Sequence, residues 1–135
     1  MRSTLVLSAL AALLVTSVAL AAKPQAASAD LSSLAASGVT GTASFKEEQN
    51  GDVRLHEQVS GLTPGAEYTS VIFLGGATCG SGTAVPVMTF TANNAGKANF
   101  NVVVGPQAAP AITGSASITV QQGSTQLACG EIVAQ

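Results

Sequence analysis

Short stretches in which apolar and polar residues alternate make up most of the chain from residue 38 onward. In residues 53–60, Val53, Leu55 and Val59 share one face, and most of the polar side chains share the other. A period of two is typical of a strand with one buried face, and no stretch here sustains the 3.6-residue period of an amphipathic helix. The pattern predicts strands at residues 39–46, 53–60, 67–74, 86–91, 97–104, 115–121 and 127–133.

Glycine, proline and asparagine residues separate these predicted strands. Asn50-Gly51 favours a tight hairpin turn, Pro64-Gly65 closes a turn over residues 61–65, and Asn93 to Gly96 mark a further hairpin. A glycine-rich loop is expected at residues 75–83. Seven or eight short strands at near-regular spacing predict one all-β domain, a β-sandwich or a β-barrel.

The N-terminus has the layout of an export signal. Arg2 precedes an uncharged apolar run from Leu5 to Leu20, and Ala19-Leu20-Ala21 is a small-residue cleavage pattern, with a second at residues 27–29. The alternative is an uncleaved membrane anchor, but the run is shorter than the roughly 20 residues needed to span a bilayer. We expect a signal peptide at residues 1–21 and a secreted or periplasmic protein that is free of the membrane after cleavage.

The segment after the signal peptide is rich in alanine and serine. We expect a flexible leader at residues 22–37, with at most one weak strand near residues 31–36, and a folded domain at residues 38–135. Whether that weak strand joins the domain stays open.

Composition excludes several functions. Charged residues make up 9 % of the chain and the formal net charge is −2, so a basic nucleic-acid binder is excluded. Lys46, Arg54 and Lys97 are too few for an anion-binding patch. Aromatic residues are 4 % and tryptophan is absent, which argues against stacking platforms. One histidine and two cysteines exclude most metal and haem sites.

The two cysteines are Cys79 and Cys129. In an exported chain they are expected to form a disulfide, because the compartment is oxidising. The alternative is a pair of buried free thiols.

Five motifs occur in a specific order along the chain. They are Val39-Thr40-Gly41 with Phe45, the hairpin from Asn50-Gly51 to Gly61-Leu62-Thr63-Pro64-Gly65, Thr78-Cys79-Gly80-Ser81-Gly82, Asn94-Ala95-Gly96-Lys97-Ala98, and Leu127-Ala128-Cys129-Gly130-Glu131-Ile132. In this order, with both cysteines in register, the chain resembles the copper/zinc superoxide dismutase superfamily. The resemblance implies a Greek-key β-barrel or flattened sandwich. It also implies that Cys79 ties a loop to the last strand.

The resemblance does not extend to the metal ligands. Ser70 and Ile72 lie near the positions of the family's His-x-His copper pair, and Val120 and Gln121 lie where a further ligand is expected. Gln126 replaces the active-site arginine. The loops at residues 80–85 and 123–125 are short where the family has its zinc loop and substrate-guiding loop. The chain equally resembles the non-catalytic chordin-like repeat domains of this fold, so we expect no enzyme activity, cofactor or metal.

The remaining candidate residues have plain structural interpretations. His56 is interpreted as a solvated surface residue, the alternative being a metal anchor or pH sensor. Glu57 shares the parity of the apolar residues of its strand and is expected at a barrel end or bulge.

Glu47, Glu48 and Asp52 could form a weak calcium site, but turn carboxylates are usually solvated. Ser70 and Ser81 have no histidine near them in sequence for a triad, and the glycine-rich loop lacks the lysine and helix of a phosphate cradle.

Three functions remain as hypotheses. The first is a non-catalytic exported domain with a structural or partner-binding role. The second is a divergent superoxide dismutase or copper-handling envelope protein, which would depend on His56. The third is an accessory subunit of an envelope assembly, in which an edge strand pairs with an unknown protein partner. The sequence leaves the partner and the oligomeric state open.

Overall fold

The computed structural model describes residues 25–135. They form an all-β domain of nine strands, with a 3-10 turn at Pro106–Ala108 and one short helix, α1, at Pro110–Thr113. The strands are β1 (Ala26–Ser33), β2 (Thr40–Glu47), β3 (Val53–Ser60), β4 (Glu67–Gly75), β5 (Gly82–Thr91), β6 (Ala98–Val104), β7 (Ala116–Gln122), β8 (Thr125–Glu131) and β9 (Val133–Ala134). The all-β fold predicted from the alternation is confirmed.

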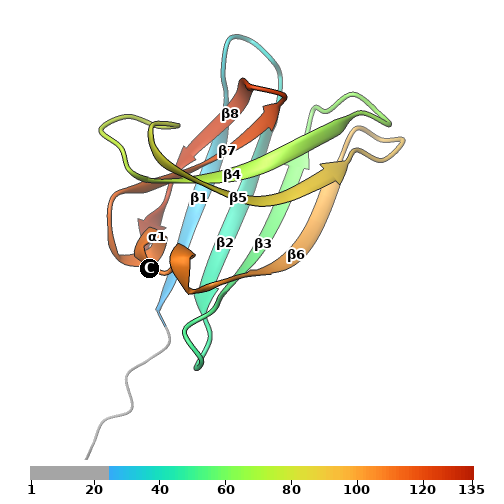
Figure 1. The fold of residues 1–135 in the computed structure, drawn as a ribbon. Helices are drawn as coiled ribbons and strands as arrows, with labels where there is room; N and C mark the ends of the chain where they lie inside the picture. Colours follow the sequence, from blue (N-terminus) through green and yellow to red (C-terminus); the bar gives the residue numbers. More distant parts are fainter. Residues whose placement is uncertain (1–24) are drawn as a thin grey trace, which may run out of the picture.

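The strands form a nearly closed antiparallel barrel with Greek-key connections (Figure 1). Their order is β5-β4-β7-β8-β1-β2-β3-β6, and β9 pairs with β1 off this path. The sheet therefore has two halves, β6-β3-β2-β1 and β5-β4-β7-β8, which face each other across the core. Strand β1 joins them: residues 26–31 pair with β2, whereas residues 32–33 pair with β8. No backbone ladder connects β5 to β6 in the described chain, so the barrel stays open on that side.

The core lies between the two halves of the sheet. Its largest fully buried apolar side chains are Phe45, Leu55, Ile72, Ile118, Val53 and Val120. The alternation in β3 shows why the sequence folds this way, because Val53, Leu55 and Val59 all point inward while Arg54 and Gln58 are exposed. Burying one face of each strand removes apolar area from water, which is the main source of stability in a barrel of this size.

The N-terminal part of the domain differs from the expectation. Residues 26–33 form β1, a strand paired on both sides, so a flexible leader extending to residue 37 is wrong. The alternating residues Ala27, Ala29 and Leu31 are buried. Because alanine and serine have low strand propensity, this alternation does not predict a strand from the sequence. The strand forms because its neighbours supply the partners. The predicted signal peptide at residues 1–21 lies outside the described residues.

The other predicted strands match the observed ones closely, with three differences. The strand predicted at residues 127–133 is divided into β8, which starts at Thr125 and ends at Glu131, and β9, which pairs with β1. Strand β5 begins at Gly82, four residues before the predicted start, and Pro86 lies inside it. Proline lacks an N–H group, and it fits here because β5 is at the end of the sheet and its pairing with β4 is irregular after Ser70. The helical turn at residues 110–113 is too short for its period to be detected, and it packs Ala111 and Ile112 into the core.

Within residues 25–135, no helix has the length and apolar character needed to cross a membrane.

Candidate functional site

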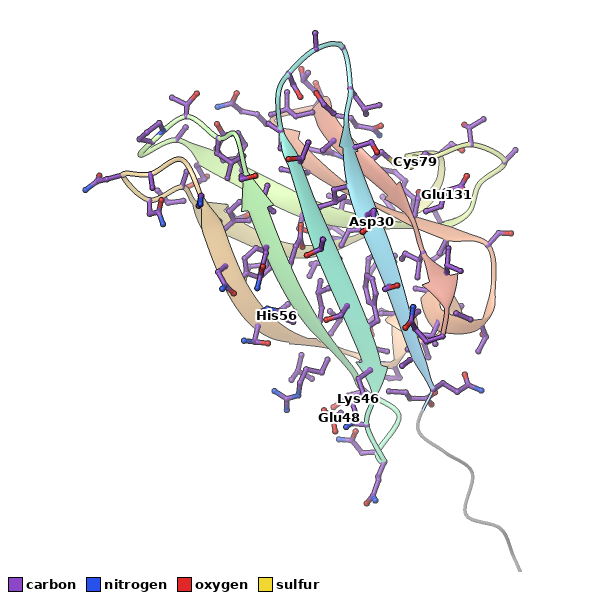
Figure 2. All side chains as sticks on the ribbon, turned by 180° about the vertical axis from the view of Figure 1, so that it is seen from behind. Asp30, Lys46, Glu48, His56, Cys79 and Glu131 are labelled. Carbon is purple, nitrogen blue, oxygen red and sulfur yellow. A yellow bond between two sulfur atoms is a disulfide. The ribbon has the colours of Figure 1, made fainter. Side chains whose placement is uncertain are left out.

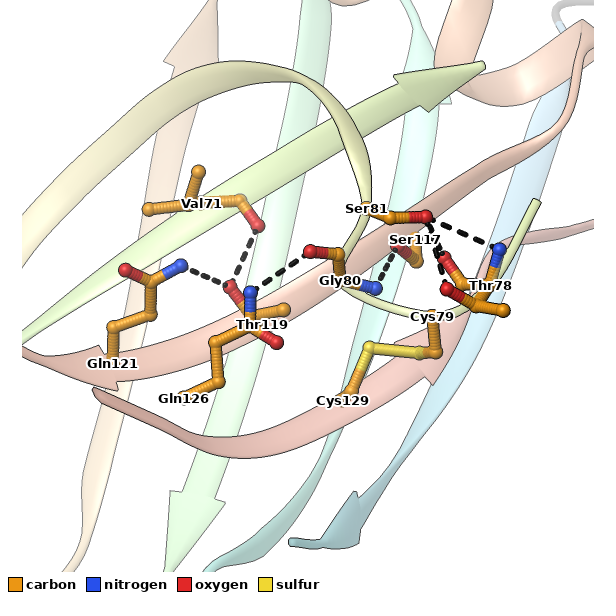
Figure 3. Close-up of a disulfide and its surroundings, with 10 residues drawn as sticks. All are labelled: Val71, Thr78, Cys79, Gly80, Ser81, Ser117, Thr119, Gln121, Gln126 and Cys129. Atoms are coloured by element: carbon orange, nitrogen blue, oxygen red, sulfur yellow. Dashed lines mark hydrogen bonds between the residues drawn. A yellow bond between two sulfur atoms is a disulfide. The ribbon is translucent and has the colours of Figure 1, made fainter. Parts of the chain in front are cut away.

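A disulfide-linked loop covers the outer face of the β4-β7-β8 sheet (Figure 3). Cys79, in the loop between β4 and β5, is bonded to Cys129 on β8, with the Cα atoms 6.1 Å apart. The predicted pairing is confirmed. Thr119 on β7 lies beside Cys129 in the strand register and is fully buried, although it is on the outer side of the sheet. The loop thus encloses a face that would otherwise be exposed to solvent.

The loop is held in place by hydrogen bonds around Gly80. The Gly80 N–H donates to Ser117 Oγ at 2.9 Å, and Gln126 Nε2 donates to the Gly80 carbonyl at 2.9 Å. At the loop tip, Ser81 Oγ donates to the Thr78 carbonyl at 2.7 Å. The glycine-rich segment is therefore a tight loop beside a disulfide, and its backbone groups at Gly80 already have partners.

Polar side chains fill the space beside the loop. Thr119 Oγ1 donates to the Val71 carbonyl at 3.3 Å and accepts from Gln121 Nε2 at 3.0 Å. Gln121 is paired in register with Gln126 on β8. This outer face therefore carries amide and hydroxyl groups that bind one another or nearby backbone carbonyls.

The residues at the expected ligand positions separate into two groups. Ser70, Ile72 and Val120 are fully buried and face the barrel interior, so they do not share a site with the outer face. Gln121 and Gln126 do lie together on the outer face. The family's copper chemistry requires several imidazoles in one geometry, and the residues present on this face do not supply them.

A shallow groove of about 240 Å³ lies next to the loop. It is lined mostly by small residues, among them Gly76, Ala77, Ser115 and Ala116, together with Glu131. One carboxylate and a few hydroxyl groups do not specify a ligand class.

His56 lies on the opposite side of the molecule, on the outer face of the β6-β3-β2-β1 sheet (Figure 2). Its Nδ1 is 3.0 Å from Asn101 Oδ1, and Gln58 Nε2 donates to its Nε2 at 3.1 Å. A neutral ring with the proton on Nδ1 satisfies both contacts. The structure supports the surface interpretation of His56 and separates it from Ser70 and Ser81, so no Ser-His pair is assembled.

The acidic turn between β2 and β3 is occupied by local contacts. Glu48 accepts a hydrogen bond from Arg54 Nε at 2.7 Å, and Asp52 accepts one from Asn50 at 3.0 Å. Across residues 25–135, no group of three or more histidine, cysteine, aspartate or glutamate side chains is placed to hold a metal ion. Glu48 and Asp52 of this turn are therefore engaged by neighbouring side chains.

Glu57 is the unexpected feature of the interior. It lies in the middle of β3, in regular register with β2 and β6, and its exposed fraction is 0 %. The expectation of a barrel end or bulge is therefore wrong. Its Oε2 accepts a hydrogen bond of 2.7 Å from Ser70 Oγ on β4, which is also fully buried. Its Oε1 has no hydrogen-bond partner among the residues that the structure describes.

Burial changes the acidity of this carboxyl group. Desolvation raises the pKa of Glu57 from an ordinary value of 4.5 to about 7, and the hydrogen bond from Ser70 opposes part of that rise. The inward parity of Glu57 was visible in the sequence. The partner was not, because Ser70 belongs to a strand of the other half of the sheet.

A scan of the sequence against protein-family models finds no matching family, and a search among curated proteins finds no matching sequence.

Proposed function

We propose that this chain is an exported, non-catalytic β domain with a superoxide dismutase-like fold and a structural or partner-binding role. The ordered motifs of the sequence and the Greek-key strand order support the fold assignment. The disulfide between Cys79 and Cys129 supports export, because such bonds persist in oxidising compartments.

One observation carries the non-catalytic part of the proposal. On the outer face of β4, β7 and β8, beneath the disulfide loop, Thr119 binds Gln121 and the Val71 carbonyl, and Gln126 binds the Gly80 carbonyl. The other expected ligand positions, Ser70, Ile72 and Val120, are buried in the interior and carry no imidazole. The single histidine of the chain lies on the opposite sheet and has amide partners of its own. A structural role agrees with a face whose polar side chains bind within the fold.

Metal analysis of the exported, oxidised protein tests this proposal. The protein is incubated with copper and zinc, desalted, and assayed for metal by mass spectrometry and for superoxide dismutation, with an active copper/zinc enzyme as the positive control. We expect less than about 0.1 metal ion per chain, because one imidazole does not build a copper site. We also expect no dismutation above free-metal background.

Two variants sharpen the outcome. Near-stoichiometric copper that is lost in His56→Ala and retained in Gln58→Ala would overturn the proposal in favour of a copper-handling protein. Copper retained in both variants, with dismutation, would also overturn it and would place the ligands away from His56.

A further inference from the structure

The hydrogen bond between Ser70 and Glu57 links the two halves of the barrel through its interior. Glu57 belongs to the β6-β3-β2-β1 half and Ser70 to the β5-β4-β7-β8 half. In the described chain it is the only hydrogen bond between two fully buried side chains. The other contacts across the core are apolar and therefore carry no directional preference.

This bond lies beside the open side of the barrel. The partner of Glu57 on β6 is Phe100, and the partner of Ser70 on β5 is Met88. Strands β5 and β6 have no backbone ladder between them, and a contact between the Phe90 and Phe100 rings, with centroids 4.9 Å apart, spans this side instead. The Glu57–Ser70 bond thus connects the strands next to both free edges.

Among residues 25–135, no buried charged group compensates for an ionised Glu57. Its register neighbours in the two adjacent strands are Ala43 on β2 and Phe100 on β6, and on its own strand His56 and Gln58 face outward. The buried side chains of residues 25–135 include no lysine, arginine, histidine or aspartate. Tyr68 on β4 is the other titratable buried side chain, and its hydroxyl accepts from the Thr63 N–H at 2.8 Å.

The buried environment stabilises the neutral form of Glu57 relative to the carboxylate. A protonated Glu57 can exchange hydrogen bonds with Ser70 Oγ, which both donates and accepts, and its second oxygen then bears no net charge. An ionised Glu57 would have one donor for two charged oxygens in a water-excluded core, and such a group favours states in which water reaches it. Opening along the β5–β6 side breaks no backbone ladder of the described strands.

We propose that Glu57 and Ser70 form a proton-dependent clasp that closes the barrel along its unpaired β5–β6 side. With a proton bound, the clasp holds the two halves together. When the proton is lost, the side opens and the edges of β5 and β6 become available to solvent or to an added strand. The domain therefore responds to a change from acidic to neutral or alkaline surroundings.

Hydrogen exchange resolved by strand tests the clasp. We expect protection of β5 and β6 amides, corrected for intrinsic exchange, to fall about a hundredfold between pH 5 and pH 8, since opening then releases a proton. At pH 8, β5 and β6 should be less protected than β1 and β2, because they exchange through the local opening, whereas β1 and β2 exchange through global unfolding. Glu57→Gln, which stays neutral, should abolish this pH dependence, and the exposed-position control Glu67→Gln should retain it. Ser70→Ala should reduce the protection of β5 and β6 already at pH 5.

A pH dependence that Glu57→Gln reproduces, or equal protection of β5–β6 and β1–β2 amides at pH 8, would overturn the clasp. A second measurement needs no variant: carbon-13 NMR of the Glu57 carboxyl in the native protein. Titration near pH 7 supports the clasp, since burial raises the pKa of this carboxyl, and titration below pH 5 would overturn it.

Discussion

Two buried polar side chains, Thr119 and Glu57, show how differently a polar group can be accommodated in one barrel. Both have an exposed fraction of 0 %. Thr119 donates to the Val71 carbonyl and accepts from Gln121, so its hydroxyl has the partners it needs. Glu57 has one donor, Ser70, and one oxygen without a partner. A satisfied group stabilises one state, whereas an unsatisfied acid makes stability depend on pH.

The disulfide that encloses Thr119 supplies the largest expected effect. Replacing both cysteines, Cys79→Ser with Cys129→Ser, should lower the free energy of unfolding by about 4 kcal/mol, because the bond restricts the unfolded chain between positions 50 residues apart. Urea denaturation without reductant measures the loss. Reduction of the native protein should match it, and an unchanged midpoint would show that the disulfide contributes no net stability.

Glu57 supplies the second effect, which depends on pH. Its pKa is about 7 in the folded protein and near 4.5 when unfolded, so its contribution is fully present below pH 4.5. Stability falls as pH rises from 4.5 through 7 and then levels off, with a total loss of about 3 kcal/mol. Urea denaturation at a series of pH values measures it, and Glu57→Gln should remove this slope. A native stability that is flat across this window would contradict the assignment.

The hydrogen bonds around Gly80 supply a smaller effect. Gly80 has φ +77°, and a Cβ there would displace the Gln126 amide that bonds its carbonyl. Gly80→Ala should cost about 2 kcal/mol, of which about half reflects the left-handed backbone and the rest the lost hydrogen bond. Gly123→Ala is the matched control, with φ +60° and no neighbouring atom within 4 Å, and it should cost about 1 kcal/mol. Equal losses in thermal denaturation would show that the contact with Gln126 contributes nothing.

His56 supplies the smallest effect. Its ring lies on the outer sheet face and forms hydrogen bonds with the surface side chains of Asn101 and Gln58, so His56→Ala should change the free energy of unfolding by no more than about 0.5 kcal/mol. Urea denaturation at pH 8 checks this. A loss several times larger would mean that the hydrogen bonds of His56 on this outer face contribute substantially to the stability of the barrel.

The strands at 53–60 and 67–74 show what could be predicted from the sequence. Their alternation placed Val53, Leu55 and Val59 on the buried face, and the same parity put Glu57 with them. Side chains alternate between the two faces of any extended strand, so the face of each residue can be predicted without knowing which strands pair with it. The interpretation of Glu57 as a barrel-end residue was wrong because a lone carboxylate in a core is costly, and the partner that tolerates it lies in another strand.

The candidate site was predictable only in its cysteines. In an exported chain with two cysteines, one pairing is available, whereas the position of Ser70 depended on which face of β4 is turned inward. The full extent of strand β1 was not predicted, for a related reason. Its alanine and serine side chains carry a weak local signal, and its pairing with β2, β8 and β9 supplies the stability.

The sequence by itself determined the β class, the turns, the two cysteines and the inward parity of Glu57, since each depends on neighbours along the chain. Only the tertiary structure decided that β1 completes the sheet, that the disulfide loop encloses Thr119, and that Ser70 meets Glu57 across the core. These features depend on contacts between residues far apart in sequence, and such contacts follow from how the two halves of the sheet pack on each other.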